Sequence, residues 1–339
     1  MSPFPETGAP RPIEHDPLEP GVTLSVVVPA FNEADNIPLL HARLAETLQR
    51  LVPDSWELIL VDDGSRDLSW AVTCQLSTED ARVKGVRLSR NFGHQYALWA
   101  GLELAGGQAV VMMDCDLQHP VEKLPELVAK WRAGFKVVKT QRKDETASLG
   151  WFKRWTSRTF YRVFAYLSGV GLQPGLADFR LFDRQALREM LRFKEEGLFL
   201  RGLTEWIGFP SCVISYVPAP RAHGRSGYSL KKMLKLAWNG VSSFSTTPLR
   251  IGILIGLVGS VVSVIGVLYA FFGHFFGRRA VPGWASTLIV ISLLFCLLFV
   301  YLGILGEYIG RMVVEVRRRP RFIVSETAGF RKTNAAPYE

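Results

Sequence analysis

Short apolar runs alternate with helical patterns through the first part of the chain. Four runs with apolar centres lie at residues 23–31, 56–65, 83–91 and 108–116. Each is followed by a segment with apolar residues at helical spacing, such as IPLLHARLAETLQRL at 37–51. Strands that are continuously apolar and separated by helices are typical of a parallel sheet covered on both faces. The pattern therefore predicts an α/β domain that binds its ligand at the carboxyl ends of the strands.

Two later runs, 251–272 and 286–306, contain no charged residue. At about 1.5 Å per residue, a helix over either run is long enough to cross a hydrocarbon core of roughly 30 Å. Buried helices of soluble proteins usually keep a polar stripe, whereas these runs carry only scattered Ser, Gly and Tyr. We therefore predict a two-helix transmembrane hairpin over 249–310.

Glycine pairs in or beside these runs have the four-residue spacing that lets transmembrane helices approach closely. This spacing serves packing within the hairpin or packing between the chains of a homo-oligomer. The pairs are Gly252 with Gly256 and Gly306 with Gly310.

Basic residues flank the predicted spans. Residues 229–248 place apolar side chains on one helical face and Lys231, Lys232 and Lys235 on another, which predicts an amphipathic juxtamembrane helix in the headgroup layer. Residues 311–339 read as a basic tail. Lys and Arg concentrate on the cytoplasmic side of membrane proteins, so we expect a multi-pass protein of the inner membrane with the α/β domain and both termini in the cytoplasm.

Composition narrows the picture further. Hydrophobic residues make up 48% of the chain, which is high for a purely soluble protein. Residues 1–21 are rich in Pro and acidic side chains and read as a disordered lead-in rather than a signal peptide. Much of the net charge of +9 lies near the spans, which favours contact with anionic membrane lipid over nucleic acid. The four cysteines are far apart and predict neither a disulfide framework nor a zinc-thiolate site.

Polar side chains gather where the predicted strands end. In an extended segment alternate side chains share a face, so Asp114 and Asp116 repel each other unless a cation lies between them. This geometry suggests a divalent metal, Mg²⁺ or Mn²⁺. The chain has no Walker A sequence and no GxGxxG, so a nucleotide would be held through carboxylates and a metal. The polar clusters are Asn32 with Glu33, Asp62 with Asp63, and Asp114 with Asp116.

Five segments together carry a more specific signal. They are VVVPAFNEADNI, LVDDGSRD, RNFGHQYALWAGLELAGGQAVVMMDCDLQHP, DFRLFDR and KKMLKLAWNGVSSFSTTPLR. Over about residues 22–320 the chain resembles the polyprenol-phosphate glycosyltransferases of family 2, the relatives of dolichol-phosphate mannosyltransferase that have two C-terminal spans. The resemblance implies a GT-A fold with its catalytic domain over 22–228, followed by interfacial helices and the two spans.

The resemblance also implies a donor site. The family holds the nucleotide with its Pro-Phe/Tyr-Asn-Glu segment and with the first Asp of the DDGS turn, and it binds metal and diphosphate with its DxD segment and the Gln two residues on. The corresponding nucleotide residues here are Pro29, Phe31, Glu33 and Asp62. The corresponding metal and diphosphate residues are Asp114, Asp116 and Gln118, with the Cys115 backbone beside them.

Phosphate groups call for cationic side chains. The resemblance points to Arg142 and Arg221, which together with Asp116 are the residues expected to act in catalysis. Because the site must bring two anions together, Lys153 and Arg180 are further candidates, with Ser157 as a hydrogen-bond donor. A solvated surface charge is the alternative for Lys153 and Arg180. Relatives often carry Lys where this chain has Gly227, so one expected cation is absent there.

These features predict an enzyme that moves one sugar from a UDP- or GDP-type nucleotide sugar to a polyprenyl phosphate of the undecaprenyl type. We expect metal dependence, inversion at the anomeric carbon and a role in cell-envelope glycan or lipid modification. One alternative is a processive polysaccharide synthase, although the stretch RGLTEWIGF stands where such enzymes have QxxRW. The other alternative is a nonenzymatic, membrane-anchored nucleotide-binding protein.

Overall fold

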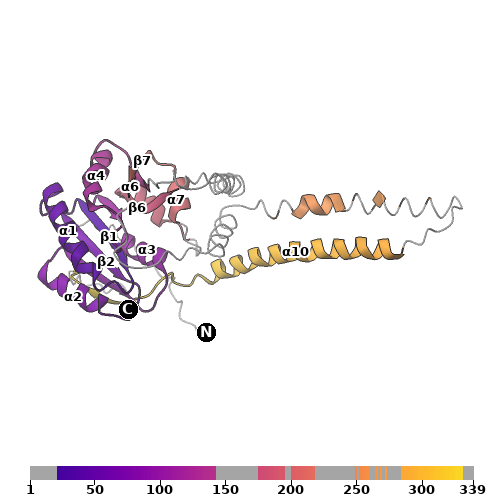
Figure 1. Ribbon diagram of the computed structural model, residues 1–339, viewed down its shortest axis with the longest axis horizontal. Helices are drawn as coiled ribbons and strands as arrows, with labels where there is room; N and C mark the ends of the chain where they lie inside the picture. The colour runs from indigo at the N-terminus through magenta and orange to yellow at the C-terminus, as the bar shows by residue number, and fades with distance from the viewer. Residues whose placement is uncertain are drawn as a thin grey trace, which may run out of the picture.

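A computed structural model describes the α/β domain and parts of the segment that follows it (Figure 1). The expected juxtamembrane helix at 229–248 and residues 1–20 of the expected lead-in lie outside the described residues. The described residues are 21–142, 175–194, 200–217, 249, 252–259, 261, 264–265, 268, 272 and 284–330.

Four parallel strands form the centre of the sheet. They are β1 (Leu24–Ala30), β2 (Trp56–Asp62), β3 (Val83–Leu88) and β4 (Ala109–Met112). The strand β1 lies between β2 and β4, and β3 pairs with the far side of β2. Every residue of β1, β2 and β4 is buried, as expected for strands covered on both faces. The predicted α/β domain with a parallel core is confirmed.

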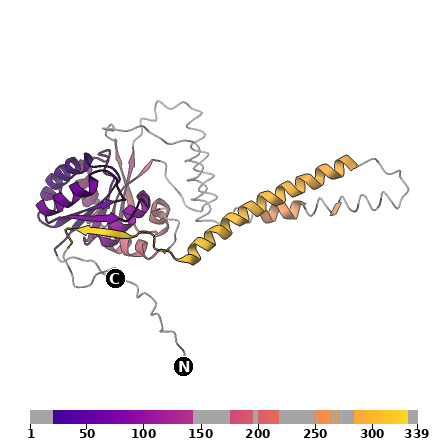
Figure 2. The same cartoon turned by 90° about the horizontal axis from the view of Figure 1, so that it is seen from below.

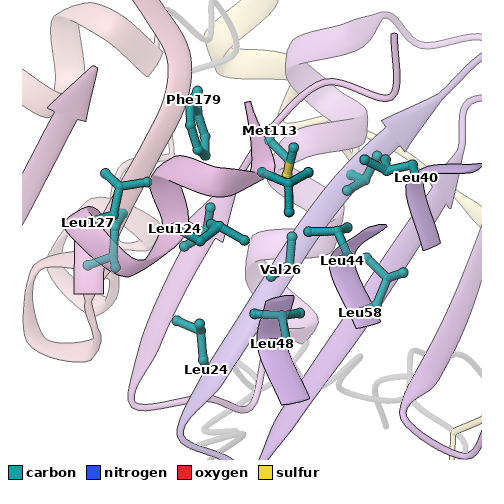
Figure 3. Close-up of a cluster of buried hydrophobic side chains, with 14 of the residues drawn as sticks. Leu24, Val26, Leu40, Leu44, Leu48, Leu58, Met113, Leu124, Leu127 and Phe179 are labelled. Atoms are coloured by element: carbon teal, nitrogen blue, oxygen red, sulfur yellow. The ribbon is translucent and has the colours of Figure 1, made fainter. Parts of the chain in front are cut away.

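Helices cover both faces of this sheet. On one face, α1 (Asn36–Leu51) places Leu40, Leu44 and Leu48 over the strands, since a spacing of four residues keeps side chains on one side of a helix (Figure 3). The one-turn helix η1 (Val121–Lys123) and α4 (Leu124–Arg132) pack in the same layer. On the other face lies α3 (His94–Leu104), while α2 (Ser69–Glu79) follows β2 in the chain.

The sheet continues beyond β4 as a mixed sheet, which the sequence pattern did not predict. The strand β6 (Leu176–Asp183) runs antiparallel to β4 and to β5 (Val137–Arg142), and β7 (Ser211–Tyr216) runs parallel to β5. The short helices α6 (Arg184–Leu191) and α7 (Leu200–Trp206) contribute to the same buried layer as α3.

The chain returns to the sheet after its long helix. The helix α10 (Trp284–Arg317) extends away from the domain, and β8 (Val324–Ala328) then pairs antiparallel with β3 as the last strand of an eight-stranded sheet (Figure 2). The order is β7-β5-β6-β4-β1-β2-β3-β8. Part of the expected tail at 311–339 is therefore a structural element of the α/β domain.

One helix in the described part of the chain is long and apolar enough to cross a membrane. It covers Leu293–Arg317 of α10, with a mean hydropathy of 2.0 and no burial inside the protein. The first expected span is described only in part, and its residues 252–259 are helical. The two-helix hairpin at 249–310 therefore stays a prediction.

Gly252 brings this first helical segment against α10. A Cβ added at Gly252 would collide with the Tyr301 ring, whereas an added Cβ at Gly306 or Gly310 would meet nothing within 4 Å among the residues that the structure describes. Gly252 thus serves packing within one chain. The homo-oligomer stays a prediction.

A buried ion pair lies at the amino ends of the strands and leads to a stability prediction. Lys84 Nζ is 2.7 Å from Glu57 Oε2, and both side chains are almost completely buried. The other Glu57 oxygen accepts hydrogen bonds from Ser25 Oγ and the Gly106 backbone N–H. Lys84→Met leaves the carboxylate buried without its partner, so we expect the free energy of unfolding to fall by about 3 kcal/mol. Denaturant unfolding measures this.

The exposed Lys130→Met in α4 is the matched control for that substitution, and we expect it to change the free energy of unfolding by less than about 0.5 kcal/mol. Equal stabilities for the two variants would show that the buried pair does not contribute to stability.

Candidate active site

A cavity of about 340 Å³ lies at the carboxyl ends of β1, β2 and β4. Parallel strands bring their carboxyl ends to one edge of a sheet, so residues that are far apart in sequence meet there. The described residues that line it are Pro29, Ala30, Phe31, Glu33, Asp63, Asn91, Gly93, His94, Asp114, Cys115 and Asp116. Six of the predicted site residues are therefore brought together.

The two aspartates stand on a tight turn directly after β4. The Gln118 backbone N–H donates to Asp116 Oδ1 at 3.1 Å, and Leu117 between them adopts a left-handed φ of 61°. The Asp114 backbone N–H donates to His119 Nδ1 at 3.0 Å, which places the proton of that neutral ring on Nε2, 3.6 Å from Asp114 Oδ2. Burial lowers the pKa of His119 to about 4, so the ring is neutral at physiological pH.

Negative charge accumulates at this turn. Burial raises the pKa of Glu33, and repulsion from Asp116, Asp67 and Asp114 adds to that rise against the hydrogen bond from Asn36. The buried Oδ1 atom of Asp114 accepts no hydrogen bond. An unpartnered carboxylate oxygen in an acidic cavity fits a divalent cation.

Protein ligands alone do not complete a metal site. Within the part of the chain that the structure describes, no group of three or more His, Cys, Asp or Glu side chains is arranged to hold a metal ion. Divalent cations of this class take six or more oxygen ligands, so a cation here would need further ligands from a bound molecule or water. Gln118, the third predicted ligand, is buried beside the pair.

Arg142 lies at the end of β5, near the two aspartates. Its Nε donates to the Tyr216 hydroxyl at 3.1 Å. Burial opposes the charged form, but the hydrogen bond to Tyr216 and the attraction of Asp114 and Asp116 outweigh it and raise the pKa of Arg142. This half-buried guanidinium therefore stays charged beside the acidic cavity.

The DDGS turn holds the wall of the cavity in place. Asp63 accepts hydrogen bonds from the backbone N–H groups of Phe92 and Gly93, at 2.7 and 2.9 Å. Gly64, at φ 69°, lies against the backbone of Arg90 and Asn91, where a side chain would collide. Loop 89–93, which carries Asn91 and Gly93, is thereby fixed on the carboxyl edge.

Asp62 lies just behind the cavity wall, where it is 1% exposed. Its Oδ1 accepts a hydrogen bond from the Ser65 backbone N–H at 3.0 Å, and its Oδ2 lies 3.4 Å from Arg87 Nε. Among the described residues, Asp63 lines the cavity and Asp62 does not.

Arg180 is placed away from the cavity. Its side chain is fully buried, its Nε donates to the Ala177 carbonyl, and both of its terminal nitrogens are without a hydrogen-bond partner. Burial lowers the pKa of Arg180 to about 10. Arg180 is therefore neither the solvated surface charge nor the cavity-lining cation that the sequence suggested. Lys153, Ser157, Arg221 and Gly227 lie outside the described residues.

Three further residues contact the site without having been predicted. His94 Nε2 lies 3.4 Å from Asp114 Oδ1 and 4.0 Å from Asp178 Oδ2. Arg201 donates to both Asp178 oxygens at 2.9 Å. Although burial opposes it, this pairing lowers the pKa of Asp178 to about 2, so the carboxylate is ionised. The position of His94 just after the third strand was an available signal, since ligands gather at strand ends.

Carboxylates at the carboxyl edge of a parallel sheet lie where α/β enzymes bind their ligands. The chain belongs to glycosyl transferase family 2, whose profile matches residues 25–191, and it is a glycosyltransferase.

Relatives align over most of the chain. The uncharacterized glycosyltransferase YkcC of Bacillus subtilis (strain 168) is 40% identical over 91% of this chain and 95% of its own length. The SfII prophage-derived bactoprenol glucosyl transferase of Shigella flexneri is 37% identical over 90% of this chain and 98% of its own length. Among solved structures, glucosyl-3-phosphoglycerate synthase from Mycobacterium tuberculosis in complex with Mn²⁺, UDP-glucose and phosphoglyceric acid superimposes with a TM-score of 0.43. It shares 23% identity, over 66% of this chain and 78% of that chain.

Proposed function

We propose that this glycosyltransferase moves one sugar from a nucleoside-diphosphate donor to a polyprenyl phosphate at the cytoplasmic face of the cell membrane. The observation that carries the proposal is the pair Asp114 and Asp116, which faces an acidic cavity with the cationic Arg142 beside it. The relatives named bactoprenol glucosyl transferases support a polyprenyl phosphate acceptor and make nucleoside-diphosphate glucose the first donor type to test.

Donor binding is assigned to the first two strand ends and the aspartate turn. Phe31, 42% exposed at the cavity wall, offers a ring face to the base, while Glu33 accepts hydrogen bonds from base or ribose and the buried Asp62 holds the DDGS turn behind the cavity wall. Asp114, Asp116 and Gln118 would hold Mg²⁺ or Mn²⁺ on the diphosphate. When bound, the metal neutralises the charge that develops on the departing diphosphate.

Acceptor binding is assigned to the opposite side of the aspartate pair. A lipid monophosphate is an anion at neutral pH, so its oxygen attacks the anomeric carbon without a strong general base. Arg142, positioned by Tyr216, neutralises that phosphate as it approaches the donor. A single in-line displacement of this kind inverts the configuration at the anomeric carbon.

The position of β8 supports a hairpin with both ends on the side of the catalytic domain. Because β8 follows α10 and pairs with β3, the chain must come back to the side from which it left. If α10 crosses the membrane, a second crossing is needed, and the uncharged run at 251–272 has the length for it.

The test is a donor panel. Purified full-length protein in vesicles that contain undecaprenyl phosphate is given UDP- and GDP-sugars, each labelled in the sugar. We expect one donor to yield a label that is extracted into organic solvent and released by mild acid. The anomeric configuration of the product, measured by NMR, should be opposite to that of the donor. Label in a water-soluble or insoluble polymer would instead indicate a processive synthase, and release of free sugar alone would contradict the acceptor assignment.

A further inference from the structure

Strand β8 is held against the catalytic domain by more than backbone pairing. Arg321, four residues after the end of α10, donates to the Phe193 carbonyl at 2.6 Å and lies over the Trp99 ring. Phe322, Val324 and Phe330 pack against the buried layer beneath β3. The segment that follows the long helix is thus fixed at both ends of β8.

Arg87 of β3 connects this strand to the candidate donor site. Arg87 is the register partner of Glu326 on one side and of Asp62 on the other. Its Nη1 donates to Glu326 Oε1 at 2.8 Å, and its Nε lies 3.4 Å from Asp62 Oδ2. The Arg87 guanidinium therefore lies between two carboxylates, Glu326 on β8 and Asp62 at the carboxyl end of β2.

The contacts on Glu326 fix the direction of the Arg87 side chain. Trp70 Nε1 donates to the other Glu326 oxygen at 3.0 Å, and the Ser325 hydroxyl donates to the Arg87 carbonyl at 3.1 Å. With its terminal nitrogen held on β8, Arg87 places charge beside Asp62 without a hydrogen bond to Oδ2, which has no hydrogen-bond partner. That oxygen is buried, so its charge is compensated from within the protein by the Arg87 guanidinium.

We propose that Glu326 is a positioning residue for the donor site: through Arg87 it keeps the Asp62 carboxylate compensated in charge and in place behind the cavity wall, where the other Asp62 oxygen holds the Ser65 backbone N–H of the DDGS turn. The inference rests on the proposed binding of the nucleotide donor in this cavity. Without Glu326, the guanidinium is free to turn and form a full ion pair with Asp62, which competes with the hydrogen bond from the Ser65 backbone N–H and shifts the turn behind the cavity wall. The strand that follows the membrane helix would then be part of the donor site's support.

The test uses the full-length protein and compares Glu326→Gln with Thr327→Val. Both residues are exposed on β8, and the two substitutions are nearly isosteric, but only the first removes the partner of Arg87. We expect Glu326→Gln to raise the donor KM about fivefold, the effect of losing one partly exposed ion pair, while kcat and the KM for polyprenyl phosphate stay within twofold. Thr327→Val should leave all three unchanged.

A double substitution separates positioning from general support of the fold. If Glu326 acts through Arg87, then adding Glu326→Gln to an Arg87→Ala background should raise the donor KM no further. Unchanged donor KM in Glu326→Gln, or equal losses in kcat and in both KM values, would overturn the inference. Calorimetric titration with the nucleoside diphosphate alone is read in parallel. Weaker binding of the nucleoside diphosphate to Glu326→Gln supports the role of Glu326 even if no sugar is transferred to polyprenyl phosphate. The role of Glu326 and the proposed function can therefore fail independently.

Discussion

Asp116→Asn is expected to reduce sugar transfer at least about a hundredfold, the scale on which one preorganised electrostatic group contributes to a transition state. Asn keeps an oxygen for the Gln118 N–H but removes the charge that would hold a divalent metal on the diphosphate. Initial rates of transfer at saturating donor measure the loss. Asp35→Asn is the control, since the exposed Asp35 side chain makes no capping hydrogen bond at the start of α1.

Removal of the metal should reproduce this loss in the unsubstituted enzyme. We expect EDTA to abolish transfer and Mg²⁺ or Mn²⁺ to restore it, because without the metal two neighbouring carboxylates repel the diphosphate. Asp116→Asn should also bind Mn²⁺ more weakly than the unsubstituted enzyme in a titration followed by electron paramagnetic resonance. Full activity in the presence of chelator would refute the assignment of Asp114 and Asp116 to a metal.

Arg142→Ala should be the second most damaging substitution and should act on the acceptor. We expect kcat/KM for polyprenyl phosphate to fall about a hundredfold, because a half-buried guanidinium that faces an incoming phosphate is lost. Arg142→Lys should recover part of the loss, since it restores charge without the planar donor geometry. Affinity for the nucleoside diphosphate should change less than threefold.

The control for Arg142 is Arg132→Ala, which removes an exposed guanidinium from the end of α4. It should leave both kinetic parameters unchanged. If Arg142→Ala weakened nucleotide binding and left the acceptor KM intact, the guanidinium would belong to the donor site.

The parallel core was predictable because its signals are local. The strands β1 to β4 are short apolar runs, and α1 carries leucines at a spacing that defines its buried face. Each element can be recognised without knowing its neighbours. The edge strand β8, with the sequence VSETA, has no such signal. It forms a strand because β3, some 240 residues earlier, offers an unpaired edge. From its composition alone, this segment was predicted to be a basic tail.

That strand also changes how the domain can be studied. A form truncated at about Ile251 would lose both apolar runs and, with them, the strand that covers β3 and holds Arg87. Any loss of nucleotide binding in such a form would mix removal of the two apolar runs with damage to the sheet. Substitutions in the full chain separate the two effects.

Site residues could be predicted where they directly follow the carboxyl ends of parallel strands, and less well elsewhere. Glu33, Asp114 and Asp116 meet at one cavity because parallel strands end at one edge. Arg180 was misplaced because a charged residue in a strand usually points to solvent, whereas β6 is covered by α7, whose Arg201 and Glu205 lie near it. Asp178 was overlooked because β6 runs antiparallel, so the amino end of β6 reaches the carboxyl edge of the sheet.

The central claim is that the chain transfers a sugar, and not a sugar phosphate, to a lipid phosphate. Mass spectrometry of one reaction with undecaprenyl phosphate and the preferred nucleotide sugar tests it most directly. We predict equal amounts of nucleoside diphosphate and of a lipid heavier than the acceptor by one glycosyl unit, with both products reduced at least about a hundredfold in Asp116→Asn. Nucleoside monophosphate together with a lipid diphosphate sugar, or nucleoside diphosphate without any new lipid, would contradict it.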